Sequence, residues 1–280
     1  MDMSLPAEHA MTRRLLPWVP ASLAAALAAL GSQAADAASR CARHSPAHTV
    51  ALVELYTSEG CSSCPPADRW LASLAEQQAA GRLVSLALHV DYWDYIGWRD
   101  PWAQSGFTAR QRQLAKGGTI YTPEVFMGQR ELRRWYDAGR FQSRLDEINR
   151  QPARADIGLA VEVETTRAAT ARARARIVAE ARFTLRATPP TGAVTGVLVA
   201  YEDGLASEVK RGENRGSTLR HSAVVRRWES ATLANERQTL RWEIPVEAGW
   251  NPQQLGFAAF VQDARNGEIL QALALPTCTS

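Results

Sequence analysis

Two cysteines three positions apart are the residues most suited to chemistry. Cys61 and Cys64 lie in the stretch EGCSSCPPAD. This spacing serves a redox pair, half of a metal site, or a bridge that stiffens a turn. Structural zinc needs four ligands in closed geometry, and Cys41 and Cys278 form no second pair of this spacing. A bridge across so short a loop gains little chain entropy, so the redox interpretation is favoured.

The elements expected around the pair also favour redox chemistry. Thr49–Thr57 is rich in β-formers and predicts a strand, whereas Trp70–Ala80 predicts a helix. Amide donors at a helix N-terminus lower the pKa of a thiol. Cys61 is therefore expected to be the exposed nucleophile and Cys64 the resolving thiol. The two prolines that follow disfavour α geometry for the residue before each, so regular helix is expected only from around Pro66, which weakens the dipole argument.

A second motif lies downstream in TIYTPEVF, which contains Thr122 and Pro123. Here the sequence resembles the thioredoxin superfamily, in which a threonine–proline pair opens the strand that faces the CxxC. The resemblance implies that Pro123 is cis, lies beside the sulfurs and, with Thr122, lines the groove that docks an extended peptide. Cis peptides are uncommon and mark a constrained turn. The alternative is an ordinary trans Thr–Pro bond at a strand start.

Four stretches of the sequence point to a smaller family within this resemblance. VELYTSEGCSSCPPAD, HVDYWDYIGW, YTPEVFMG and GENRG together are similar to a family of exported thioredoxin-like proteins of unknown function. This family implies a redox-active disulfide, protein or small thiol substrates, a redox partner protein and no cofactor. It brings no established substrate. The interval from Cys64 to Pro123 is longer than in ordinary thioredoxins, which implies an insertion.

The expected insertion, Asp91–Gly106, carries clustered aromatic residues that include Trp93 and Trp98. It follows the predicted strand Leu83–Val90 at the edge where the cysteines are expected. Exposed aromatic clusters anchor partners, so Trp93 and Trp98 are candidate substrate-binding residues. The alternative is a loop folded onto the core, where such rings pack. The residues leave both interpretations open.

Two ionisable residues lie on the strands that lead to this edge. In thioredoxins a buried carboxylate near the position of Glu54 assists proton transfer to the resolving cysteine, so the resemblance implies that role for Glu54, one place out of register. The alternative is an edge residue that faces water. His89 and Asp91 form a pair too small to indicate a metal site, and none is predicted.

The pattern of elements predicts two domains in succession. Strand-like and helix-like segments alternate up to about Gln151–Pro152, which indicates an α/β thioredoxin-like domain over residues 46–150. Residues 153–280 contain strands of period two, such as Ile157–Val163, without intervening helices. They predict an all-β, antiparallel sandwich-like domain.

The N-terminus predicts the compartment. Arg13 and Arg14 precede an apolar run, Leu15–Leu30, and then a segment of small residues, the order of a secretory signal peptide over residues 1–38. An uncleaved anchor is the alternative, but the run is short for a membrane span. We therefore expect a periplasmic or secreted protein without a stable membrane anchor. The net charge of +3 is mild and scattered, which indicates no nucleic-acid partner.

Export also bears on the remaining cysteines. Disulfides persist in oxidising compartments, and Cys41 and Cys278 each lack a neighbouring cysteine. A Cys41–Cys278 disulfide is therefore expected. The alternatives are two free thiols, or a Cys41 that pairs between molecules.

The leading hypothesis from the sequence is an exported thiol–disulfide oxidoreductase in which Cys61 attacks and Cys64 resolves. One alternative is a copper-handling protein whose two thiols hold the metal with His89 as a third ligand. Another is a binding protein whose β domain carries the function. Copper titration and a Cys61→Ser phenotype separate these three. The CSSC sequence does not determine whether the pair oxidises, reduces or isomerises.

Overall fold

Strands dominate the structure. The computed structural model describes residues 39–166, 174–186, 194–245 and 249–276, and Asp36–Ser280 form one compact unit. The strands of this part are β1 (Ser39–His44), β2 (Ala51–Thr57), β3 (Leu83–His89), β4 (Glu124–Met127), β5 (Arg130–Glu131), β6 (Ala155–Thr166), β7 (Arg174–Leu185), β8 (Val194–Glu202), β9 (Leu205–Glu208), β10 (Thr218–His221), β11 (Val224–Thr232), β12 (Arg237–Pro245), β13 (Leu255–Asp263) and β14 (Ile269–Leu275).

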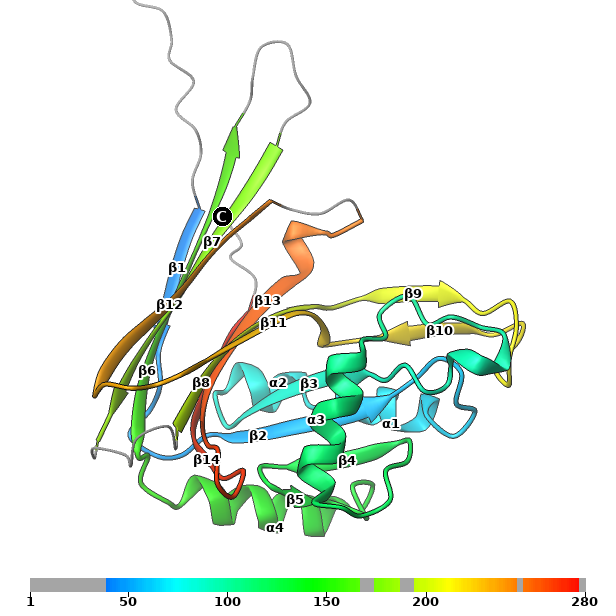
Figure 1. Cartoon of the computed structure of the whole chain (residues 1–280), viewed down its shortest axis with the longest axis horizontal. Helices are drawn as coiled ribbons and strands as arrows, with labels where there is room; N and C mark the ends of the chain where they lie inside the picture. Colours follow the sequence, from blue (N-terminus) through cyan, green and yellow to red (C-terminus); the bar gives the residue numbers. More distant parts are fainter. Residues whose placement is uncertain (1–38, 167–173, 187–193, 246–248, 277–280) are drawn as a thin grey trace, which may run out of the picture. The chain divides into compact units, whose positions relative to one another are not determined.

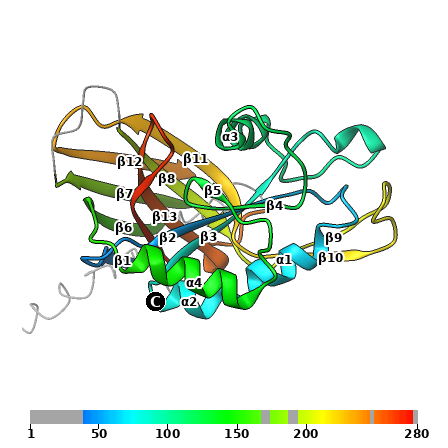
Figure 2. The ribbon, with the colours of Figure 1, turned by 90° about the horizontal axis from the view of Figure 1, so that it is seen from below.

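Short helices accompany these strands. They are α1 (Pro65–Ala72), α2 (Ala75–Ala79), α3 (Ser105–Ala115) and α4 (Ala138–Asn149), with 3-10 turns η1 (Asp94–Ile96) and η2 (Pro252–Gln254). Two views agree that α1, α2 and α4 lie on one face of the β2–β3–β4 region and α3 on the other (Figure 1, Figure 2). The helix expected over Trp70–Ala80 is divided into α1 and α2.

The expected succession of an α/β thioredoxin-like domain and a separate all-β domain is wrong. The structure is mostly β, and one eight-stranded sheet takes strands from both halves of the chain, in the order β14-β13-β8-β11-β3-β2-β4-β5. The halves join where β11 runs parallel to β3, with Val224 opposite Ala87. The amide of Ala87 donates to the carbonyl of Ala223 at 2.8 Å. A buried strand needs partners for its edge groups, and here the second half supplies them.

The remaining strands form two smaller sheets. The order β1-β6-β7-β12 gives a four-stranded sheet, and β9 and β10 form a hairpin of their own. Every pairing in the four-stranded sheet is antiparallel. Its inward residues, such as Ile157 and Phe183, share one core cluster with Leu198 of β8 and Phe257 of β13. The alternating pattern seen in the sequence thus buries one face of β6 against the large sheet.

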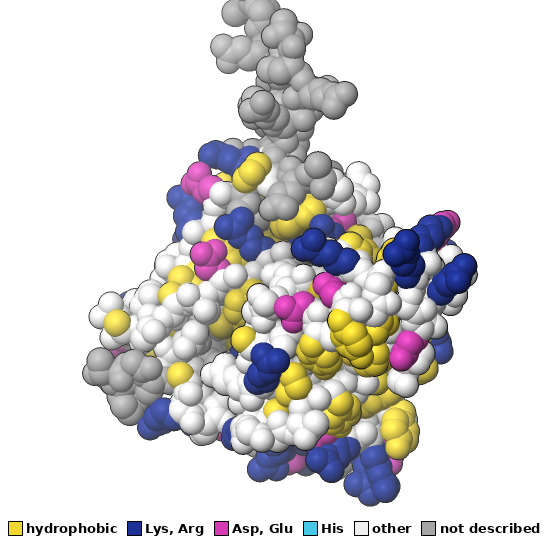
Figure 3. Space-filling model, turned by 45° about the vertical axis from the view of Figure 1, so that its right-hand side comes forward, with side chains coloured by type: hydrophobic (Ala, Val, Ile, Leu, Met, Phe, Trp, Pro, Cys, Tyr) yellow, Lys and Arg dark blue, Asp and Glu magenta, His cyan; other side chains and the backbone are white. Residues whose placement is uncertain are grey.

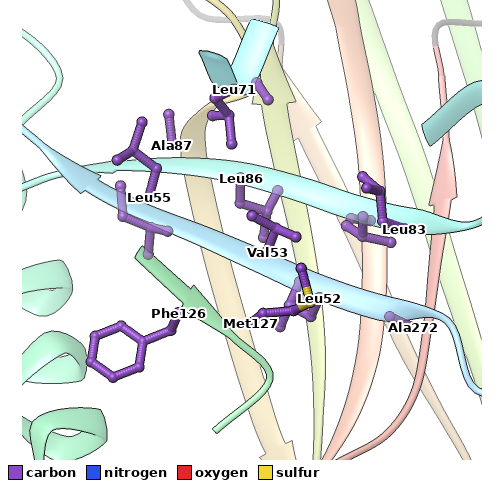
Figure 4. Packing of buried hydrophobic residues seen from close by; sticks show 14 of the residues in the cluster. Leu52, Val53, Leu55, Leu71, Leu83, Leu86, Ala87, Phe126, Met127 and Ala272 are labelled. Atoms are coloured by element: carbon purple, nitrogen blue, oxygen red, sulfur yellow. The ribbon is translucent and has the colours of Figure 1, made fainter. Parts of the chain in front are cut away.

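A second core lies between the large sheet and its helices. β2 and β3 are buried along their whole length. Figure 4 shows their side chains beside Leu71 of α1, Phe126 and Met127 of β4, and Ala272 of β14. The cluster therefore draws on both halves of the chain. This core positions the site, because β2 and β3 end where the chemistry-bearing residues begin.

Candidate functional site

The CSSC turn connects the end of β2 to α1. Cys61 and Cys64 form a disulfide with their Cα atoms 5.4 Å apart. Cys64 is the N-cap residue of α1, and its carbonyl accepts bonds from the amides of Ala67 and Asp68. The helix begins at Pro65, one residue earlier than expected. Proline is tolerated at the first helical position, because the backbone N–H of that residue has no partner within the helix and its absence costs nothing.

Both cysteines are buried, which differs from the expected exposure of Cys61. Cys61 is 1% exposed and Cys64 is fully buried, whereas Ser62 and Ser63 between them are exposed. The disulfide therefore lies beneath the surface of the turn.

The loop between β9 and β10 lies against the turn. We call residues Gly212–Gly216 the hairpin tip. The Asn214 side chain donates from Nδ2 to the carbonyl of Glu59 at 2.8 Å and to that of Cys61 at 3.0 Å. The Glu213 carboxylate accepts from the amide and the hydroxyl of Ser62, at 3.0 and 2.7 Å. The GENRG motif thus contacts the backbone of the CSSC turn from over 150 positions away.

The Asp91–Gly106 loop lies against both the turn and the tip. A Cβ at Gly60 would lie 2.9 Å from the Trp93 Cβ and 3.2 Å from the Ile96 Cδ1. A Cβ at Gly212 would lie 2.8 Å from the same Ile96 atom. Ile96 is therefore wedged between the residue before Cys61 and the first residue of the tip.

Trp93 also reaches the threonine–proline motif. Its indole Nε1 donates to Thr122 Oγ1 at 2.7 Å. The Thr122–Pro123 bond is cis, as predicted. Because the Cβ of Trp93 lies beside Gly60 and its indole nitrogen beside Thr122, the two motifs lie within the length of one tryptophan side chain.

A buried carboxylate, Glu59, lies directly before the turn. It is fully buried. Its oxygens accept from Trp98 Nε1 at 2.8 Å and from the Ser207 hydroxyl, and one of them lies 3.3 Å from His221 Nε2. Trp93 and Trp98 therefore direct their indole N–H groups inward and hold the loop. Their predicted binding of substrate stays a prediction.

Asp68 and His221 lie on the α1 side of this network. Asp68 is four positions after Cys64, which places both side chains on the same buried face of α1. Its carboxylate accepts from Thr57 Oγ1 at 2.9 Å and lies 3.7 Å from His221 Nδ1. Burial raises the pKa of Asp68, while the histidines His221 and His89 act in the opposite direction. A carboxyl with a raised pKa beside a disulfide is suited to proton transfer.

His89 and Asp100 complete the network at the end of β3. His89 Nδ1 lies 2.7 Å from Asp100 Oδ2, and both side chains are fully buried. Asp100 also accepts from the amides of Glu59 and Trp102. The rings of His89 and His221 meet edge to face, with centroids 4.9 Å apart.

Opposing effects determine the pKa values of this pair. Burial alone would lower the pKa of His89, but the Asp100 carboxylate outweighs it, so the pKa is raised. Burial alone would raise the pKa of Asp100, but His89 and the backbone amides outweigh it, so this pKa is lowered. Between the ordinary pKa values of the two groups, 3.8 and 6.5, the pair is thus an ion pair.

Glu54 lies on the side of β2 that faces α3, away from the network around the CSSC turn. Its buried carboxylate forms two hydrogen bonds with Arg110 of α3, at 2.5 and 2.9 Å. Arg110 stacks on Trp228 of β11 and lines a cavity of about 460 Å³ between α3 and the large sheet. No residue of the CSSC turn lines this cavity. Glu54 is therefore buried against α3 and does not face water. Asp68 and Glu59 are the carboxylates beside the turn.

Sequence reasoning missed Asp68, Glu59, Asn214 and His221. Asp68 and Glu59 stand within the quoted EGCSSCPPAD stretch, and the four-residue spacing from Cys64 to Asp68 could have identified the former. Asn214 had a signal only in the GENRG motif. His221 had none, because its position depends on the long-range packing of the β9–β10 hairpin.

Other expectations concern cysteines, metals and membranes. Cys41 lies on β1 opposite Val161, but Cys278 falls outside the described residues, so the Cys41–Cys278 bridge stays a prediction, and so does the signal peptide over residues 1–38. Within the described residues, no group of three or more His, Cys, Asp or Glu side chains is arranged to hold a metal ion. No helix in that part is long and apolar enough to cross a membrane.

The model of a family described as "Protein of unknown function (DUF1223)" matches residues 52–262, well over half of the chain. The chain belongs to this family. The match covers the CSSC turn, the Thr122–Pro123 bond and the hairpin tip. The expected membership of a family of unknown function is confirmed, whereas a thioredoxin-like family is not shown.

Two solved structures are similar to this family member. One is protein AGR_C_4864 from Agrobacterium tumefaciens, with 25% identity, a TM-score of 0.56, and coverage of 83% of this chain and 96% of that chain. The other is HBP35 of Porphyromonas gingivalis, with 15% identity, a TM-score of 0.56, and coverage of 83% and 76%. At that identity HBP35 shows the fold alone. A search of curated protein sequences found no match.

Proposed function

We propose that this family member is an exported thiol–disulfide oxidoreductase that uses the Cys61–Cys64 disulfide. The observation that carries the proposal is a disulfide at the N-terminus of α1 with ionisable side chains buried next to it. A disulfide with a purely structural role does not require the buried Asp68 on the same helix, or the His221 side chain that lies 3.7 Å from Asp68. Such groups are costly to bury, and perturbed ionisable groups cluster at functional sites.

The reaction follows from the arrangement of the two sulfurs. A substrate thiolate attacks Cys61 Sγ, the Cys61–Cys64 bond breaks, and Cys64 leaves as a thiolate. A second substrate thiolate then attacks the substrate sulfur of the mixed disulfide, and Cys61 leaves as a thiolate. Two electrons pass from the substrate dithiol to the cysteine pair, and the substrate becomes a disulfide. The reverse sequence reduces a substrate disulfide, and a redox partner protein restores the starting state.

Asp68 is the group that we propose for proton transfer, in place of Glu54. The thiolate of Cys64 is released into a buried environment, where a charge is unfavourable. The protonated Asp68 carboxyl can supply a proton to it, and the Asp68 carboxylate can remove that proton when Cys64 attacks a mixed disulfide. His221 Nδ1 lies 3.7 Å from the carboxylate and lowers the pKa of Asp68, against the raising effect of burial.

The sequence resemblance to the thioredoxin superfamily is used here for the roles of residues and not for the fold. From that resemblance we keep Thr122 and Pro123 as the lining of a groove beside Cys61. Trp93 and Trp98 act as positioning residues through Thr122 and Glu59. Export is supported by the signal-like order of residues 1–38 and by the persistence of disulfides outside the cytosol.

The test is disulfide exchange with a fluorescent peptide that contains two cysteines, followed in both directions. Cys61→Ser is expected to abolish exchange, and Cys64→Ser to leave a mixed disulfide on Cys61 that mass spectrometry detects. Ser63→Ala, an exposed position within the turn, is the matched control and should exchange like the native chain. Exchange by the native protein no faster than by Cys61→Ser would contradict the proposal.

A further inference from the structure

We propose that the hairpin tip is a removable cover of the Cys61–Cys64 disulfide, displaced by an extended polypeptide substrate that carries the reacting cysteine. The inference rests on the proposed oxidoreductase function and names the substrate class of the same site. Its starting point is a contradiction between that function and the structure. A disulfide that exchanges must be reached by a substrate sulfur, yet Cys61 is 1% exposed.

The tip is held by contacts that can break without unfolding the hairpin. Asn214 and Glu213 make the side-chain hydrogen bonds to the turn, and Gly212 packs against Ile96. The tip belongs to a two-stranded sheet of four-residue strands, and such a sheet is marginally stable alone. The base of the hairpin is held separately, because Ser207 and His221 bond to Glu59. The tip can therefore lift while the base stays in place.

The Glu213 contact is charge-assisted. Hydrogen bonds from the side chain and the backbone of Ser62 lower the pKa of Glu213, so its carboxylate is ionised at neutral pH. An ionised acceptor strengthens both bonds. The same negative charge next to Cys61 disfavours a thiolate there, so displacement of the tip both uncovers the sulfur and removes a charge that opposes its reaction.

The groups that the tip releases define the substrate. They are the carbonyls of Glu59 and Cys61 and the amide of Ser62. An extended polypeptide presents N–H and C=O groups in alternation and can satisfy both kinds, as in recognition by strand addition. A small thiol without amides cannot, and leaving such groups without partners is costly. A cysteine-containing peptide segment therefore fits, and a simple small thiol does not.

The right-hand side of Figure 1, where β9 and β10 lie, comes forward in Figure 3. Hydrophobic side chains gather on it among basic ones (Figure 3). Among the described residues the large hydrophobic side chains that are exposed are Tyr95, Tyr121 and Tyr136. Tyr95 lies next to Ile96, and Tyr121 precedes Thr122, so both lie close in sequence to residues that flank the turn.

The first experiment measures access to the disulfide with an uncharged reductant. Tris(hydroxypropyl)phosphine reduces the oxidised native protein and its variants, taking up the oxygen of water, and the release of thiols gives the rate. Asn214→Ala is expected to react about tenfold faster than the native chain, because it loses two hydrogen bonds. Glu213→Gln, an exposed change, should react severalfold faster and guards against misfolding of the first variant. Glu208→Gln removes a charge from the same hairpin without touching the turn and should react at the native rate.

The second experiment tests the substrate class. The native protein is reduced either by a peptide with two cysteines or by dithiothreitol, and the ratio of the two rates is measured. The ratio of the peptide rate to the dithiothreitol rate should be severalfold higher for the native protein than for Asn214→Ala, because only the peptide replaces the contacts of the tip. Equal phosphine rates in the native chain and both tip variants would overturn the cover, and an unchanged ratio would overturn the polypeptide substrate. Neither outcome would alter the expected reduction potential of the Cys61–Cys64 pair, on which the proposed function depends.

Discussion

At the level of single residues, the site is defined by buried ionisable groups that have different partners. Glu59 is held by neutral donors and His221, Asp68 by Thr57, and Asp100 by an ion pair with His89. Only Asp68 lies on the helix of Cys64. Because neighbouring charges and burial move the pKa values of Asp68 and Asp100 in opposite directions, one carboxyl is suited to carry a proton and the other to remain charged.

The ion pair predicts a pH-dependent stability. The pKa of His89 is raised above its ordinary value of 6.5, so its contribution is fully present below that pH and is lost as the pH rises through the folded-state pKa. The pKa of Asp100 is lowered, so its contribution is present above its ordinary value of 3.8 and is lost as the pH falls through the folded-state pKa. Asp68 and Glu59 also face His89 and raise its pKa in the same direction.

Asp100→Asn is therefore expected to cost about 3–5 kcal/mol in the free energy of unfolding at pH 5.5, and less at pH 9. Urea unfolding at the two pH values measures this. Asp94→Asn is the control, because its carboxylate accepts from the Asp100 amide and is not paired with His89. A loss of the same size at both pH values would contradict the assigned pKa shifts.

The sequence pointed to the Cys61–Cys64 pair and to the Thr122–Pro123 bond, but not to the side chains that surround them. The CxxC spacing and the Thr–Pro pair are local patterns. The structure has a Cys61–Cys64 disulfide and a cis Thr122–Pro123 bond, but Cys61 is buried where it was expected to be exposed. Glu54 was assigned a role because of its strand position, but Arg110 on a distant helix determines its contacts. Local patterns carry no information on such long-range pairing, which is why His221 was missed.

At the level of elements, three connecting segments enclose the disulfide. The CSSC turn follows β2, the loop with η1 follows β3, and the hairpin tip joins β9 to β10. The ends of neighbouring parallel strands β2 and β3 meet at the same edge of the sheet, so two of these segments come together through sheet geometry alone. The third depends on the contact of the hairpin with α1.

Two glycines of the tip allow a matched test of this packing. Gly212 and Gly216 have φ of +76° and +83°, so alanine strains the backbone at both. Only at Gly212 would the added Cβ meet another residue, 2.8 Å from Ile96 Cδ1, whereas nothing lies within 4 Å at Gly216. Gly212→Ala should therefore lower the free energy of unfolding by about 1–3 kcal/mol more than Gly216→Ala.

Thermal unfolding of both variants measures this difference, and phosphine reduction provides a second readout. Gly212→Ala should also be reduced faster than Gly216→Ala, because the clash displaces the tip from the turn. Indistinguishable stabilities would show that Ile96 does not wedge between the tip and the turn.

Elements with long apolar runs were predictable, whereas short polar ones were not. The strands β2 and β3 lie within one or two residues of their expected ranges. The β9–β10 hairpin was missed, because only Leu219 and His221 in β10 are buried and strands of four residues give too few periods to recognise.

At the level of the whole molecule, the large sheet joins the two halves of the chain. β3 from the first half pairs with both β2 and β11, and Val197, Phe260 and Ala272 from the second half belong to the core around β2. The alternation of elements in the first half and of residues in the second half was correctly recognised as local order. It could not reveal which strand edges meet, because edge pairing leaves no periodic signal.

The shared sheet predicts cooperative unfolding. The two halves should unfold in a single calorimetric transition, with equal calorimetric and van't Hoff enthalpies. A fragment that ends at Gln151 should fail to fold. The edge of β3 that pairs with β11 is buried in the whole chain, and in the fragment it would be exposed and unpaired. Its circular dichroism spectrum measures this. Two separate transitions, or a folded fragment, would show that the halves are independent.

The reduction potential of the Cys61–Cys64 pair tests the central claim most directly. The oxidised protein is equilibrated in glutathione or dithiothreitol redox buffers, and the fraction of reduced pair is read by alkylation and mass spectrometry, with Cys61→Ser as the control for the assignment. A thiol–disulfide oxidoreductase is expected to give a value between about −270 and −120 mV, the range from thioredoxin to DsbA. A value below about −300 mV, typical of structural disulfides, would contradict the account.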